Sequence, residues 1–165
     1  MVKFPLPIDT DPEFAAALGR LIAYWGNLEF NLIHLRQILL DIDNTKARFI
    51  YQGFFSIRAK ITLLKRLNHF YILDNTLKKD IAELLKETEN RNEIRNSFVH
   101  VTWTHGSQSH MLRSETSLPG YSKFKKPLKK FTAQQVQKEV EDIAKLSLAF
   151  QNLILRLLGV LEEQP

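Results

Sequence analysis

The chain contains no cysteine. Without cysteine there is no disulfide, no metal site built from thiolates and no cysteine nucleophile, so the composition excludes three kinds of chemistry at once. A chain that uses no cysteine fits a reducing compartment, and we therefore expect a cytoplasmic protein.

Long hydrophobic runs are also missing. Residues 1–14 lack the apolar core of a secretory signal, and no uninterrupted apolar run approaches the ~20 residues that a membrane-spanning helix needs. The most apolar stretch, residues 143–161, includes Lys145 and Arg156 and is typical of a deeply buried helix. We expect a soluble protein with no membrane partner.

The sequence has neither a glycine-rich phosphate loop nor the motif of a nucleophilic serine on a sharp turn. Four histidines share no ligand spacing with one another or with carboxylates: His34, His69, His105 and His110. We therefore expect no bound metal and no other cofactor.

What the chain does have is enough apolar content for one core. With 165 residues, 44% of them hydrophobic, it is long enough for one domain and short for two, so we expect a single domain over residues 1–165. Its formal net charge of +5 favours acidic partners such as nucleic acid.

Part of this charge lies in a basic segment, Tyr121–Phe131, which contains no acidic residue and three aromatic residues. Its lysines are Lys123, Lys125, Lys126, Lys129 and Lys130. Basic loops with interleaved rings bind phosphates and stack on bases, so these five lysines are candidates for RNA binding. The alternative is a solvated loop whose lysines only keep the chain soluble.

Apolar residues at alternating steps of three and four predict amphipathic helices. The first begins at Pro12, with Asp11 as its cap. Its apolar face consists of Phe14, Leu18, Leu21, Trp25, Leu28, Leu32, Leu35 and Leu39. A second apolar series consists of Ile50, Phe54, Ile57, Ile61, Leu64 and Tyr71. Gly53 and Ser56 interrupt that series, which predicts a short helix followed by a longer one.

A third long helix is expected from Asn75 or Thr76 to about His100. Helical periodicity then disappears, and residues 101–131 predict a small β-hairpin or loop insertion. Thr132 opens the last helix with a capping box. Long helices with short connections pack best in opposite directions, so the expected fold is all-α: an antiparallel bundle of four to five helices with the insertion before the last one.

The second half of the third long helix places polar residues where a buried face should be apolar. An apolar stripe in its first half comprises Leu77, Ile81, Leu84 and Leu85. Extended at about 100° per residue, the stripe meets Thr88, Asn92, Arg95 and Val99. Burying polar groups without partners costs on the order of several kcal/mol each, so we expect them to pair internally or to line a cleft or interface.

Asn92, Asn96 and His100 follow one another at intervals of four, and Arg91 and Arg95 form the adjoining row. Arginine supplies a permanent charge, histidine exchanges protons near neutral pH, and asparagine orients a ring or holds a substrate oxygen. These groups suit RNA cleavage without a metal. A base helps the ribose 2′-OH attack the phosphorus, a cation stabilises the charge growing on the phosphate, and an acid protonates the leaving oxygen.

The same residues also allow a purely structural role. Arg91 and Arg95 would then pair with buried acids such as Glu29, while His100 would cap a helix end. Glu29 lies beside the apolar face of the first helix, where it either pairs with a core cation or orients the polar cluster. The sequence leaves both roles open.

Arg95, Asn96 and His100, near the end of a long helix before a loop, resemble the signature of the HEPN superfamily: arginine, a polar residue and, after a gap, histidine. The resemblance implies a helical bundle that dimerises so that two motifs converge in one cleft. In many members this cleft is a metal-independent endoribonuclease linked to toxin, antiviral or RNA-processing systems. Arg95 and His100 would be catalytic with Asn96 beside them, and we expect Arg91, Asn92 and Glu29 to support them.

The chain departs from the toxin branch of that superfamily at Thr102, where the branch carries a tyrosine to which a partner enzyme attaches a nucleotide. We expect a homodimer that cleaves RNA to 2′,3′-cyclic phosphate ends, in a toxin or defence system with an antitoxin or other protein as a further partner. Some HEPN members lack activity, so the alternative is a non-catalytic helical module that binds nucleic acid or protein.

Overall fold

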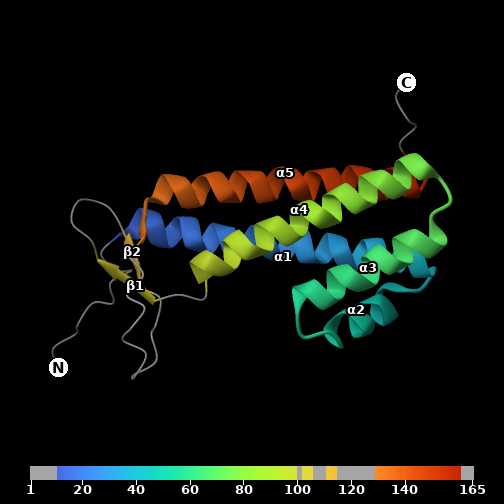
Figure 1. Ribbon diagram of the computed structural model, residues 1–165, viewed down its shortest axis with the longest axis horizontal. Coiled ribbons are helices and arrows are strands. Elements are labelled where there is room, and N and C mark those ends of the chain that lie inside the picture. The colour runs from blue at the N-terminus through green and yellow to red at the C-terminus, as the bar shows by residue number, and fades with distance from the viewer. Residues whose placement is uncertain (1–10, 100–101, 106–110, 115–128, 161–165) are drawn as a thin grey trace. The chain divides into compact units, whose positions relative to one another are not determined.

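The computed structural model describes residues 11–99, 102–105, 111–114 and 129–160, and this part of the chain is mostly helical, as predicted (Figure 1). Its helices are α1 (Pro12–Leu40), α2 (Asn44–Gln52), α3 (Ile57–Tyr71), α4 (Asn75–Val99) and α5 (Ala133–Leu157). Its strands are β1 (Thr102–His105), β2 (Met111–Ser114) and β3 (Lys129–Phe131). Among the described residues, no helix combines the length and the apolar character that crossing a membrane requires.

The predicted helix starts are confirmed by their caps. The Asp11 carboxylate accepts a hydrogen bond of 2.9 Å from the backbone N–H of Phe14 at the start of α1. In α5, the Thr132 hydroxyl accepts from the Gln135 backbone N–H at 3.2 Å, and the Gln135 side chain accepts from the Thr132 N–H at 2.9 Å. This reciprocal pair is the predicted capping box.

The predicted break in the second apolar series is also confirmed, because Gly53 caps the end of α2 and Ser56 caps the start of α3. The apolar phase predicted across the break is wrong at both ends. Ile50 is 36% exposed and Tyr71 is 60% exposed. The interruption resets the rotation of the chain, so α2 buries Tyr51 instead of Ile50.

The described residues form two compact units, and each of the three long helices contributes to both. The first unit holds the described residues of Met1–Ala23 and Ile94–Glu141, and the second those of Tyr24–Glu93 and Asp142–Pro165. The expectation of one domain over the whole chain stays a prediction.

The first unit contains the insertion before α5, for which the sequence predicted a β-hairpin or loop. Its described strands instead form a three-stranded antiparallel sheet in the order β1-β2-β3, because β3 adds to the hairpin of β1 and β2. Phe14 of α1 and Trp103 of β1 meet edge to face, with ring centroids 4.7 Å apart. Phe98 of α4 and Phe131 of β3 meet in the same way at 5.0 Å. The Trp103 indole N–H donates to the Phe98 carbonyl at 3.0 Å, so aromatic packing fastens the sheet to the helices of this unit.

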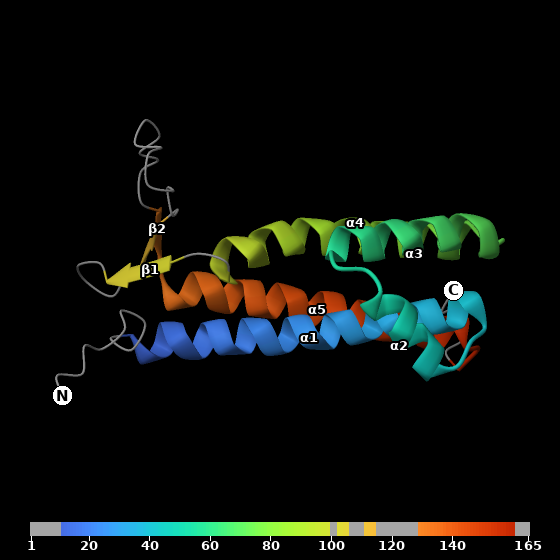
Figure 2. The same cartoon turned by 90° about the horizontal axis from the view of Figure 1, so that it is seen from below.

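In the second unit, polar contacts set the direction of α4 against α5. Asp80 accepts from Arg156 at 2.7 Å, and Arg91 donates to Asp142 at 3.0 Å. The partner of the earlier α4 residue, Asp80, is the later residue of α5, and the partner of the later one, Arg91, is the earlier. These parts of the two helices are therefore antiparallel, as Figure 2 shows.

Helix α3 also runs antiparallel to the first part of α4. Lys65 donates to Glu89 at 2.6 Å, and the Asn68 amide donates to the Lys78 carbonyl at 2.8 Å. In the same unit, the buried Asn31 amide of α1 donates to the hydroxyl of Ser147 in α5 at 2.8 Å.

Candidate functional site

Helix α4 carries four of the residues that the sequence predicts for the site: Arg91, Asn92, Arg95 and Asn96. Its apolar half buries Ile81 and Leu85 completely. Thr88 follows at 0% exposure and satisfies its hydroxyl by donating to the Leu84 carbonyl at 2.8 Å. Beyond Thr88 the same face is only half-buried, so its polar residues reach the surface of α4.

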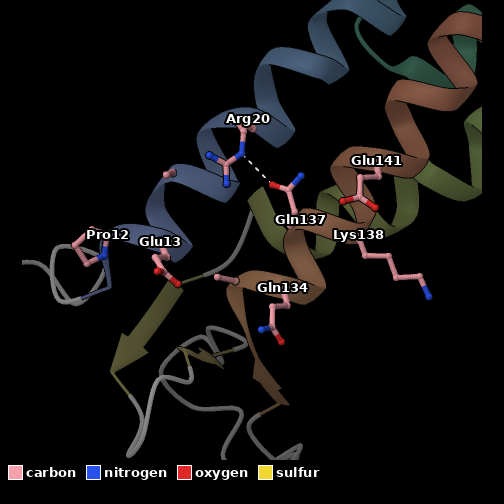
Figure 3. Close-up of a pocket in the computed structure, with 9 residues that line it drawn as sticks. Pro12, Glu13, Arg20, Gln134, Gln137, Lys138 and Glu141 are labelled. Carbon is pink, nitrogen blue, oxygen red and sulfur yellow. Dashed lines mark hydrogen bonds between the residues drawn. The ribbon is translucent and has the colours of Figure 1, made fainter.

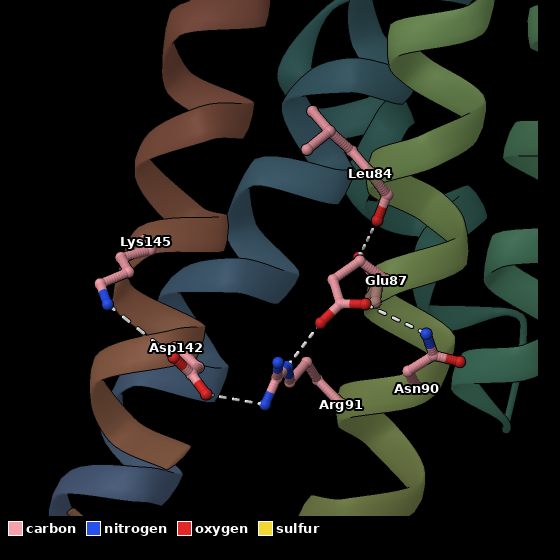
Figure 4. A network of polar contacts seen from close by, with 7 residues as sticks. Leu84, Glu87, Asn90, Arg91, Asp142 and Lys145 are labelled. Carbon is pink, nitrogen blue, oxygen red and sulfur yellow. Dashed lines mark hydrogen bonds and ion pairs between the residues drawn. The ribbon is translucent and has the colours of Figure 1, made fainter. Parts of the chain in front are cut away.

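Arg91 is the centre of an ion-pair network in the second unit (Figure 4). Its Nε donates to Glu87 at 2.7 Å, and its Nη1 donates to Asp142 at 3.0 Å. Glu87 also accepts from the Asn90 amide at 3.0 Å, and the Lys145 ammonium lies 3.9 Å from Asp142. Two carboxylates therefore hold the Arg91 guanidinium and tie α4 to α5 within this unit.

The neighbours of Glu87 shift the pKa of its carboxyl group. Burial alone would raise its pKa, but the hydrogen bonds from Asn90 and Arg91 and the Arg91 charge together lower that pKa. The lowered pKa means that the ionised form of Glu87 is stabilised. This agrees with Arg91 acting as an internal ion-pair partner. A phosphate group would have to compete with both carboxylates for this guanidinium.

Arg95 and Asn96 form a pair of their own in the first unit. The Nη1 of Arg95 donates to the amide oxygen of Asn96 at 3.0 Å, and both side chains are half-buried. This charge-assisted contact orients the guanidinium of Arg95. The pair stands one turn before the end of α4.

The other predicted site residues are placed as follows. Asn92 is half-buried on α4, Lys129 and Lys130 belong to β3, and Lys130 is exposed. His100, Lys123, Lys125 and Lys126 lie outside the described residues.

Glu29 is placed by α1 beside a cation of α3. Its carboxylate lies 3.8 Å from the Lys60 ammonium, which itself stands 3.8 Å above the centre of the Tyr51 ring. The carboxylate of Glu29 is therefore the ion-pair partner of Lys60 in the second unit.

Sequence reasoning missed Arg36, which lies on α1 at 0% exposure. Its guanidinium is 4.8 Å from the centre of the Tyr51 ring, and its three side-chain nitrogens have no hydrogen-bond partner among the described residues. Burial lowers the pKa of Arg36, and burial together with the Glu29 charge raises the pKa of Tyr51. The only feature of the sequence that pointed to burial of Arg36 is its position next to Leu35, which belongs to the predicted apolar face of this helix.

A groove of ≈850 Å³ lies in the first unit, between the beginnings of α1 and α5 (Figure 3). Its polar lining comes from Glu13, Arg20, Gln137, Lys138 and Glu141, and Arg20 donates to Gln137 at 3.0 Å. Acids and bases are balanced along it, and none of the residues predicted for the site lines it.

Within the part of the chain that the structure describes, no three His, Asp or Glu side chains come together to hold a metal ion. Comparisons of the chain with protein-family models, with curated proteins and with solved structures find no match. The HEPN resemblance accordingly stays a prediction that rests on Arg95, Asn96 and His100.

Proposed function

We propose that the protein is a homodimeric, metal-independent endoribonuclease of the HEPN type, built on an antiparallel helical bundle. The observation that supports this proposal is the half-buried pair of Arg95 and Asn96 at the end of α4, in register with His100 along the sequence.

Each group has a separate task in the proposed reaction. A His100 imidazole takes the proton of the ribose 2′-OH, whose oxygen attacks the adjacent phosphorus, and an acid gives a proton to the departing 5′-oxygen. Arg95 stabilises the negative charge that grows on the phosphate oxygens. Asn96 holds the Arg95 guanidinium in one orientation, and the dimer supplies a second imidazole for the acid.

The test is RNA cleavage by the purified protein in excess chelator, with product ends identified as 2′,3′-cyclic phosphates. General acid–base catalysis contributes about 10²–10⁴-fold, so His100→Ala should lower the rate by that factor. Replacing His69, an exposed histidine of α3, by alanine is the matched control and should leave the rate unchanged. Equal rates for wild type and His100→Ala would refute the proposal.

A non-catalytic module that binds nucleic acid or a protein partner is the second candidate. The ion pairs of Arg91 with Glu87 and Asp142 favour it, because they show that one arginine in the polar second half of α4 has structural partners. An RNA that is bound but stays intact in the cleavage assay would support this candidate. An antitoxin or other regulatory protein remains part of the first proposal.

A further inference from the structure

The segment between Asp43 and Asp74 contains no acidic residue at all. It comprises α2, α3 and the turn between them, all within the second unit. Its cations are Lys46, Arg48, Arg58, Lys60, Lys65 and Arg66. Such a separation of charge gives the α2–α3 region a positive field that attracts anionic partners.

Half of these cations are neutralised by carboxylates of neighbouring residues. The three lysines are paired: Lys46 with Asp43, Lys60 with Glu29 and Lys65 with Glu89. The three arginines, Arg48, Arg58 and Arg66, are exposed and form no ion pair with any residue that the structure describes. The uncompensated charge therefore belongs to arginine, which binds phosphates with a planar fork of donors.

Helix α3 presents two of these arginines on one outward face. Its inward face buries Ile61, Leu64 and Leu67. Arg58, Thr62, Arg66 and Phe70 follow at steps of four and are all exposed, so they form one row along the helix. A groove of ≈480 Å³ runs along this row and includes Arg58, Thr62 and Arg66 in its lining.

Exposed aromatic rings accompany the arginines. Phe55 is fully exposed, and Phe49, Phe70 and Tyr71 are each at least 60% exposed, more than any other described aromatic residue. All four rings lie in the acid-free segment. Rings of this kind lose unfavourable contact with water when an unpaired base stacks on them.

We propose that the basic-aromatic surface of α3, formed by Arg58, Arg66 and Phe70 with Phe55 just before the helix, binds single-stranded RNA. The arginines contact phosphates, and the rings stack on bases that are free of pairing partners. The choice of RNA as the ligand rests on the proposed function. A second copy of the chain fits less well, because a two-fold contact through this surface would set its unpaired arginines against themselves.

The test measures binding of a fluorescent oligouridine of twelve nucleotides, which has no internal pairing, by anisotropy at several salt concentrations. All proteins carry His100→Ala so that the RNA stays intact. Adding Arg58→Gln and Arg66→Gln should weaken binding on the order of tenfold. The slope of log affinity against log salt should fall by about 1.4, because each neutralised phosphate of a single strand contributes about 0.7.

Lys79→Gln with Lys86→Gln is the matched control, since it removes the same charge from exposed positions of α4 in the same unit and should leave the affinity unchanged. Arg58→Lys with Arg66→Lys should retain most of the binding. Phe55→Leu keeps an apolar side chain but loses the stacking face, and should weaken binding at least about fivefold. Thermal melting of each variant checks that it is folded.

Each of three binding results would overturn this inference: no binding by the parent protein, equal binding by the glutamine pair and the parent, or an equal loss in the α4 control. A change in oligomeric state at unchanged RNA affinity would also overturn it, in favour of a protein contact. If wild-type protein binds RNA through this surface but does not cleave it, the proposed ribonuclease activity fails while this inference stands.

Discussion

Two arginines illustrate how burial and partners decide the role of a charged residue. Arg91 lies between Glu87 and Asp142, so its charge is compensated. Arg36 is fully buried against the Tyr51 ring, and no hydrogen-bond partner for its guanidinium lies among the described residues. Removing an arginine that is paired with carboxylates takes away their counter-charge and destabilises the fold. Removing a buried arginine without hydrogen-bond partners removes the free-energy cost of its desolvation.

Arg36→Met should therefore raise the free energy of unfolding by about 1–3 kcal/mol, because methionine fills similar space without buried donors. Part of the gain is offset by the lost contact with the Tyr51 ring. Arg91→Met, the matched comparison, should lower the free energy of unfolding by about 1–2 kcal/mol, since it removes the cation that lies nearest to both Glu87 and Asp142. Urea denaturation measures both, and destabilisation of equal size by the two substitutions would contradict this assignment.

Glu87 predicts a pH dependence of stability. Its pKa is lowered in the folded protein, so its contribution is fully present above the pKa of the unfolded chain, about 4.3. That contribution is lost as the pH falls through the lower, folded pKa. Urea denaturation between pH 7 and pH 3 should show less acid sensitivity in Glu87→Gln than in the wild type. Identical pH profiles would mean that the Asn90 and Arg91 contacts do not persist in solution.

At the scale of the element, the sequence predicts what is decided by near neighbours. The caps at Asp11 and Thr132 and the break at Gly53 depend on contacts over a few residues, and all three are confirmed. The exposure of Ile50 and Tyr71 was predicted wrongly, because the rotation of α2 and α3 depends on what they pack against. The partner of Glu29 also escaped prediction, since Lys60 lies far along the chain.

The same locality applies to the candidate site. The contact of Arg95 with Asn96 joins adjacent residues of one helix, and the spacing that singled them out also brings them together. The network of Arg91 with Asp142 spans 51 residues of sequence, and no local pattern predicts it. The basic-aromatic surface was equally hidden, because burial decides which of its charges and rings face solvent.

The capping box of α5 allows a prediction at this scale. Thr132→Ala removes the hydroxyl that accepts from the Gln135 backbone N–H and should lower the free energy of unfolding by about 1 kcal/mol. Thr132→Ser keeps an oxygen that can cap the helix and should cost only a few tenths of a kcal/mol. Chemical denaturation of the three proteins measures the difference. Equal loss in the serine and alanine variants would show that the methyl group, and not the hydrogen bond, stabilises this helix start.

At the scale of the whole molecule, the proposed activity depends on a second copy of the chain. One imidazole and one guanidinium per subunit give a single subunit no separate acid and base, whereas two subunits supply both. Activity per molecule should therefore fall on dilution below the dissociation constant of the dimer. Light scattering at the same concentrations should show dimers giving way to monomers, and activity that stays proportional to concentration in a monomeric sample would contradict the shared site.

Mixed dimers test the shared site directly. Arg95→Ala subunits keep His100, and His100→Ala subunits keep Arg95, so a dimer with one of each has one guanidinium and one imidazole in the common cleft, whereas each variant alone lacks one of these groups altogether. With a single imidazole the mixed dimer lacks either the base or the acid and should stay slower than the wild type. Subunits unfolded and refolded together should cleave RNA faster than the two variants assayed separately and added, because only refolding together forms mixed dimers. The double variant Arg95→Ala, His100→Ala refolded with Arg95→Ala is the control, since no dimer in that mixture contains the guanidinium. A rate no greater than the sum of the separate variants would mean that each subunit acts alone, and the proposed convergence of two motifs would then be wrong.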